Sequence, residues 1–175
     1  MLIFYSPKYK NAIFTRNNCL KETCTLQRVL INPGDKLVKP EILCNWKFFS
    51  HDMQVVHCNG EDLIILPTVR TSEKLVYLEI NAIGTDGTVK WTKRVAERNS
   101  LVRLHVLNCP FNKTIVVATD NAFTVVSWTG EVVASAQVVR VNGVSRKISS
   151  LAVYEDTIVI GLVDGRFCLY RKEDL

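Results

Sequence analysis

The stretch TIVVATDNA at residues 114–122 returns as TIVIGLVDG at residues 157–165, 43 positions further along the chain. Each copy begins with a run of β-branched and aliphatic residues, which favours a strand, and ends in residues typical of tight turns. A fixed repeat decides an architecture before any single strand does. The two copies therefore predict a chain built from similar units.

Further predicted strands flank both copies. They cover residues 101–107 and 148–154 before the copies, and residues 123–128 and 166–171 after them. A weaker copy begins at Met53, where the sequence from Asp62 to Ile65 replaces the second strand. Four strands in about 43 residues is the pattern of a β-propeller blade.

Period-two alternation and short apolar runs dominate the whole chain, and no apolar stripe of helical period exceeds two turns. Asn-Gly and Asp-Gly pairs at residues 59–60, 86–87, 142–143 and 164–165, and Thr129-Gly130, supply the positive φ of tight hairpins. We therefore expect an all-β fold of antiparallel meanders. The expected strands are 2–5, 12–15, 26–31, 44–49, 53–58, 63–67, 74–80, 88–95, 101–107, 114–119, 123–128, 132–139, 148–154, 157–162 and 166–171.

Two stretches, VVSWTGEVV at residues 125–133 and IVIGLVDGRFCLY at residues 158–170, carry a resemblance to known families. They resemble the WD-repeat and quinoprotein-like β-propeller superfamilies over about residues 50–175. Thr129 follows Trp128, so the closing Trp-Asp of a WD repeat is absent and the repeat is degenerate. The sequence from Asp86 to Trp91 looks like a quinoprotein-type turn. The resemblance implies four-stranded blades and concerns architecture alone.

The domain organisation follows from the length of 175 residues, which favours one domain over residues 1–175. We expect residues 1–50 to form irregular strands of a partial blade and residues 51–175 to form blades, at about 50–95, 101–139 and 147–171. The chain is either a very small propeller or an open segment of a larger one, and we favour the open segment. An open segment leaves edges and apolar faces to be covered by a partner or by self-association. A β-sandwich is the alternative fold, because short strands at this spacing fit it too.

The composition is that of a soluble globular protein, with 47% hydrophobic and 22% charged residues. It excludes disorder, collagen and coiled coil. The first apolar stretch ends at Pro7, and no window is long enough to span a membrane, so we expect neither secretion nor membrane insertion. Six spread-out cysteines are read as reduced thiols. We expect an intracellular protein, cytoplasmic or nuclear.

Catalytic and cofactor motifs are missing from the sequence. Val-Val-His-Cys around His57 is similar to the histidine segment of chymotrypsin-like proteases, but the nucleophile segment has no counterpart. Cys19 and Cys24 are not followed by a second close pair of zinc ligands, and no phosphate-binding glycine motif occurs. We expect no enzyme activity, no cofactor and no metal site.

Basic residues gather near the junctions between the proposed blades and give a candidate binding rim. The net charge of +5 permits association with acidic partners. We predict a protein–protein interaction scaffold, a WD-like propeller subunit of a larger intracellular complex. The alternative is a propeller subunit of an RNA-processing or RNA-modification complex that contacts nucleic acid through this rim. The rim residues are Lys90, Lys93, Arg94, Arg98, Arg140, Arg146 and Lys147.

Overall fold

The computed structural model describes residues 3–6, 11–18, 23–30, 40–46, 49–50, 53–72, 75–98, 105–109, 113–137 and 147–171. These residues form strands and their connecting turns, so the expected all-β class is confirmed. Within the described part of the chain there is no helix with the length and hydropathy needed to cross a membrane.

The described residues form four antiparallel sheets that follow one another along the chain. The first sheet contains β1 (Ile3–Ser6), β2 (Asn11–Asn18), β3 (Thr23–Leu30) and β4 (Glu41–Trp46). The second contains β5 (Phe49–Ser50), β6 (Gln54–Cys58), β7 (Glu61–Ser72), β8 (Leu75–Gly84) and β9 (Val89–Arg98). The third contains β10 (His105–Cys109), β11 (Thr114–Ala118), β12 (Ala122–Ser127) and β13 (Val132–Gln137), and the last contains β14 (Ile148–Tyr154), β15 (Thr157–Leu162) and β16 (Phe167–Arg171).

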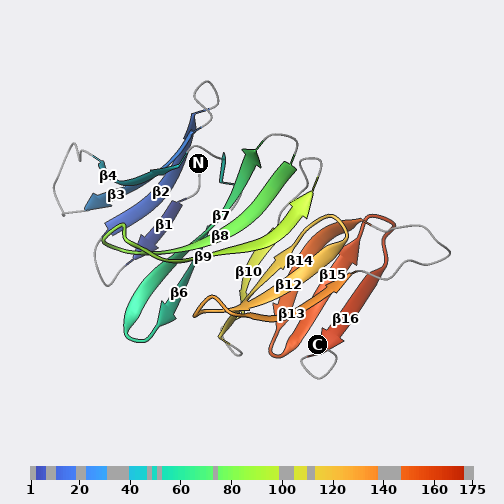
Figure 1. Ribbon diagram of the computed structural model, residues 1–175. Helices are drawn as coiled ribbons and strands as arrows, with labels where there is room; N and C mark the ends of the chain where they lie inside the picture. The colour runs from blue at the N-terminus through green and yellow to red at the C-terminus, as the bar shows by residue number, and fades with distance from the viewer. Residues whose placement is uncertain are drawn as a thin grey trace.

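Each sheet is a meander. Strands adjacent in the sequence are adjacent in the sheet, except that β5 and β6 both pair with β7. The described sheets contain no Greek-key crossover, and there are four of them, which differs from the two-sheet sandwich kept as an alternative. The sheets form a row in chain order, with the first and the last at opposite ends (Figure 1).

The core is divided between the sheets because side chains alternate between the two faces of a strand. On β7, Leu63 and Ile65 pack toward the third sheet, whereas Ile64 and Leu66 pack toward the first. The third sheet is likewise buried on both faces: Val117 joins the core shared with the second sheet, and its neighbour Val116 joins the core shared with the last. The middle sheets are therefore held by their neighbours on both sides.

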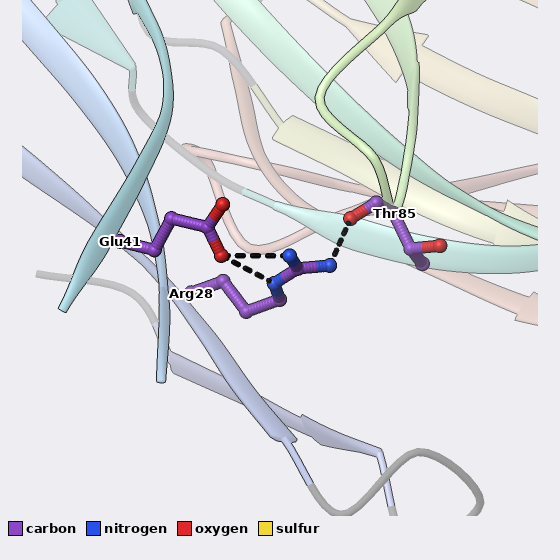
Figure 2. Close-up of polar contacts among 3 residues, drawn as sticks. All are labelled: Arg28, Glu41 and Thr85. Carbon is purple, nitrogen blue, oxygen red and sulfur yellow. Dashed lines mark hydrogen bonds and ion pairs between the residues drawn. The ribbon is translucent and has the colours of Figure 1, made fainter. Parts of the chain in front are cut away.

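Arg28 links the first sheet to the second (Figure 2). Its Nη1 donates to the carbonyl oxygen of Thr85 at 3.0 Å, and its Nη2 lies 2.7 Å from Oε2 of Glu41. The turn after Thr85 also approaches closely, since a Cβ on Gly87 would lie 2.8 Å from the Leu43 carbonyl oxygen. Gly87 has a φ of +86°, so both its backbone and its surroundings favour glycine.

Trp91 and Trp128 link the second sheet to the third. Trp91 Nε1 donates to the carbonyl oxygen of Trp128, and Trp128 Nε1 donates to Oδ1 of Asn108, both at 3.0 Å. A Cβ on Gly130 would lie 2.8 Å from Trp91 Cδ2. Gly130 follows Gly87 by 43 positions, so the repeat places a glycine turn against the preceding sheet in both cases. Trp91 and Trp128 therefore pack between the second and third sheets.

Aromatic packing and backbone hydrogen bonds link the third sheet to the last. The rings of Phe123 and Tyr170 meet edge to face with centroids 4.8 Å apart. Burial raises the pKa of the Tyr170 hydroxyl. The Ile148 amide donates to the Asp120 carbonyl oxygen at 2.6 Å, and the Cys109 thiol donates to the Glu155 carbonyl oxygen at 3.4 Å.

In the second, third and last sheets, the strands β6, β10 and β14 lie next to one another. β6 contacts β10, and β10 contacts β14. One hydrogen bond in this series runs from Gln54 Nε2 to the Val106 carbonyl oxygen at 3.4 Å. Antiparallel meanders are the coarse arrangement that the repeat and the turn residues predict.

Candidate interaction face on the last sheet

The last sheet has one face in the core and one face turned away from the other sheets. Leu151, Ile158, Ile160 and Tyr170 belong to the core shared with the third sheet. The residues that alternate with them form the opposite side, which we name the outer face. The outer face consists of Ser150, Ala152, Tyr154, Thr157, Val159, Gly161, Phe167, Leu169 and Arg171.

The strand registers arrange the outer face in rows across the sheet. Val159 lies between Ala152 on β14 and Leu169 on β16, which makes the middle row wholly apolar. Gly161 pairs with Phe167 and with Ser150 in the adjacent row. A side chain on Gly161 would collide with the Ser150 hydroxyl, so this position stays small.

Large apolar side chains on the outer face meet solvent. Tyr154 is 72% exposed, Phe167 69% and Leu169 57%. Single exposed apolar residues are ordinary, whereas a group of them on one sheet is typical of an interaction site. Val163, in the adjoining turn, is exposed as well.

The third sheet shows what such a face does when it is covered. Val116 pairs with Val125 and Ala118 pairs with Phe123, as Val159 pairs with Leu169 and Gly161 with Phe167. The last sheet packs on these third-sheet residues, and Phe123 is 1% exposed. The outer face thus carries similar residues at equivalent registers without the covering sheet.

The strand β16 adds a backbone edge to this surface. In the third sheet β12 pairs with β11 and β13, whereas the equivalent β16 pairs, within the described residues, with β15 alone. A sheet edge presents N–H and C=O groups that can pair with another strand. The outer face and the β16 edge therefore form one continuous candidate site.

The basic residues predicted as a rim lie on two different sheets. Lys90 Nζ is 3.1 Å from Glu61 Oε2. Arg94 Nε lies 3.9 Å from Glu79 Oε1, and Arg94 Cζ lies 4.0 Å from the centroid of the Tyr77 ring. Lys93 is half-buried on the same strand, β9, whereas Lys147 is exposed just before β14. Lys93 pairs with Ile80, whose side chain faces the third sheet, whereas Arg94 pairs with Glu79, so alternation places Lys93 and Arg94 on opposite faces of the second sheet. The side chains of Arg98, Arg140 and Arg146 lie outside the described residues, and the rim stays a prediction.

The side chain of His57 on β6 contacts that of Asp62 on the neighbouring strand β7. Nδ1 of His57 lies 2.8 Å from Asp62 Oδ1, and the histidine side chain is largely exposed. Among the described residues, no three His, Cys, Asp or Glu side chains gather closely enough to hold a metal ion. Cys58, Cys109 and Cys168 are thiols. The expectation that the chain is not an enzyme stays a prediction.

The outer face was not among the site residues predicted from the sequence. The 43-residue repeat contains the signal, because it places Val159 and Gly161 at the positions of Val116 and Ala118. Sequence alone does not show which copy has a neighbouring sheet. Exposure of the last copy becomes visible only in the assembled row of sheets.

Comparisons with known proteins give likenesses of fold. No protein-family model matches the chain, and no curated protein matches it. The crystal structure of the computationally designed Ika4 protein is similar with a TM-score of 0.50 and 12% identity, over 97% of this chain and 88% of that one. The uncharacterized protein lmo1340 from Listeria monocytogenes EGD-e gives a TM-score of 0.47 and 9% identity, over 90% of this chain and 57% of that one. The case for a function therefore rests on the chain's own surface.

Proposed function

We propose that this chain is a protein–protein interaction scaffold whose outer face on the last sheet binds a protein partner. The observation that carries the proposal is the contrast between Phe123, which is buried, and Phe167, which occupies the equivalent register and is 69% exposed. We further propose that the stacked meanders are blades of a propeller-like, degenerate WD-type subunit of a larger complex. Their stacking in chain order and the adjacency of β6, β10 and β14 support that assignment.

The energetics favour a protein as the ligand of this face. Fully burying a side chain such as Phe167 or Leu169 stabilises a complex by about 1.5–3 kcal/mol. Aromatic residues at the centre of an interface contribute most of its binding energy. Tyr154 and Phe167 lie on the two flanking strands of the sheet, so one protein surface can cover both.

A photo-cross-linking residue in place of Leu169 tests the proposal. In cells, we expect a discrete cross-linked product, which a second substitution, Phe167→Lys, abolishes. The matched control carries the same cross-linker in place of Val133, which is 56% exposed on β13 but does not belong to the outer face. Absence of a product at Leu169, or an identical product from Val133, would contradict the proposal.

The RNA-binding alternative has a separate readout. If the purified chain binds RNA, counterion release makes its affinity fall steeply with salt. Charge reversal at Lys93, Arg94, Arg146 and Lys147 would then abolish binding, while Phe167→Lys would leave it unchanged. That result would favour the nucleic-acid function over the scaffold.

A further inference from the structure

We propose that the outer face of the last sheet binds the first sheet of a second copy of this chain. This inference rests on the proposed protein-binding function of that face and names its partner. The contact would join the outer face to the side of the first sheet that is turned away from the second.

The interface between the third and last sheets defines what kind of surface fits. Residues on the core side of the last sheet, such as Ile158, Ile160 and Tyr170, cover a set of third-sheet side chains. These are Val116, Ala118, Phe123 and Val125. Because the outer face repeats the third-sheet residues at equivalent registers, it continues the same series of contacts. The surface that fits the outer face is therefore a sheet face equivalent to the core side of the last sheet.

The first sheet carries such a face. Leu26 packs against Ile64 and Leu66 of the second sheet, and Arg28 also reaches toward that sheet. Alternation on β3 therefore turns Gln27 and Val29 to the other side. Ile42, the register partner of Gln27 on β4, is 57% exposed.

A second molecule is needed to bring the two faces together. Figure 1 shows the first and last sheets at opposite ends of the row. Contact of the first sheet with the last sheet of another copy is head-to-tail, and such contacts close into a ring when the rotation between subunits allows it. The described residues of two copies supply eight sheets, which lies within the four to eight blades of typical closed propellers.

Sedimentation velocity of the 175-residue chain over a micromolar concentration range tests the inference. We expect a dimer. Leu169→Lys and Ile42→Lys should each weaken it by about tenfold or more, because either places an unpaired charge in an apolar contact. Val133→Lys is the control and should leave the dimer intact. Far-ultraviolet circular dichroism and thermal unfolding check that each variant is folded, and the milder Leu169→Ala should weaken the dimer in the same direction.

Mixing the two variants identifies which faces meet. Leu169→Lys retains a native first sheet and Ile42→Lys retains a native last sheet, so a mixture can form one native contact that neither variant forms alone. We expect heterodimers in the mixture. A chain that is monomeric at every concentration overturns the inference, as does a dimer that Leu169→Lys disrupts and Ile42→Lys does not.

The same variants separate this inference from the proposed function. A monomer whose Leu169 position cross-links a different protein, with loss of the product on Phe167→Lys, overturns the second copy as partner and retains the scaffold. A monomer that yields no face-dependent product overturns both.

Discussion

At the scale of single residues, turn glycines differ in whether they only adopt a positive φ or also pack closely against a neighbouring sheet. Gly60, Gly87, Gly130 and Gly165 all have φ between +84° and +92°. Gly87 and Gly130 also touch the preceding sheet, whereas Gly60 and Gly165 have open space around them. Substitution at these positions therefore separates the cost of backbone conformation from the cost of crowding.

Gly130→Ala is expected to lower the free energy of unfolding more than Gly165→Ala. Both changes incur the left-handed backbone penalty of about 1–2 kcal/mol. Gly130→Ala additionally pushes a methyl group against the Trp91 ring, which adds about 1–3 kcal/mol of overpacking. Urea unfolding measures both, and equal losses would refute the close packing of this turn on Trp91.

The turn residue Asp86 illustrates how local hydrogen bonds set a pKa. The Thr88 hydroxyl donates to Asp86 Oδ1 at 2.7 Å and the Thr88 amide donates at 3.0 Å, which lowers the pKa of the carboxyl group. Thr88→Val removes the hydroxyl, which is the larger cause, so we expect the pKa of Asp86 to rise toward its usual value. Carboxyl ¹³C NMR titration measures the change, with Thr124→Val as a control that should leave the Asp86 curve unmoved.

The sign of the linked stability change follows. A carboxyl group whose pKa is lowered by folding stabilises the fold above its unfolded pKa, and that contribution disappears as the pH falls through the folded pKa. Thr88→Val should therefore reduce the loss of stability on acidification below about pH 4. An unchanged acid profile together with an unchanged Asp86 pKa would mean that the hydroxyl does not act on the carboxyl in solution.

At the scale of strands, the sequence predicted the compact hairpins better than the long ones. The expected bounds of β14 and β15 match the structure because a turn follows each strand directly, at residues 155–156 and 163–165. β7 and β8 extend beyond the expected residues 63–67 and 74–80, to Ser72 and Gly84, because the two strands pair with each other along this whole length. The expected strand ended at Pro67. This proline is tolerated within β7 because it falls between the stretches that pair with β6 and with β5.

A buried polar network holds β7, β8 and β9 in register. Asn81 Nδ2 donates to Thr68 Oγ1 at 3.0 Å, and Thr92 Oγ1 donates to Asn81 Oδ1 at 2.8 Å. Asn81→Ala leaves the fully buried Thr68 hydroxyl without this bond, so we expect a loss of about 1–3 kcal/mol in unfolding free energy. Ser135→Ala, which removes an exposed cross-strand bond to Thr124, is the control and should change stability by less than about 0.5 kcal/mol. Equal effects in chemical denaturation would argue against the network.

At the scale of the whole molecule, the candidate site depends on which sheet has a neighbour. The repeat predicted similar units, and it did so from residues such as Val116 and Val159. Burial of one and partial exposure of the other arise from the order of the sheets, which no local pattern contains. The predicted basic residues whose side chains are described lie on β9 or just before β14, and none of them belongs to the outer face.

Phe123 and Phe167 provide a matched pair for this difference. Phe123→Ala is expected to cost about 3–5 kcal/mol, since it empties a packed interface between two sheets. Phe167→Ala should change the stability of the isolated chain by less than about 0.5 kcal/mol. At concentrations where a partner covers the outer face, the effect of Phe167→Ala should grow with concentration through linkage. Thermal unfolding at several protein concentrations measures the effect of each substitution and its dependence on concentration. A large effect of Phe167→Ala on the dilute monomer would mean that the outer face is already covered.

The sheets pack on their neighbours in chain order, and this has a consequence for how the protein is made. Each sheet draws its strands from one short stretch of sequence, so its contacts have low sequence separation and form early. As the chain leaves the ribosome, the first sheet can form and then template the second, and each later sheet arrives on an apolar surface that is already in place. During synthesis, the apolar face that awaits the next sheet is therefore that of the most recently folded sheet. This limits the apolar surface through which nascent chains can aggregate.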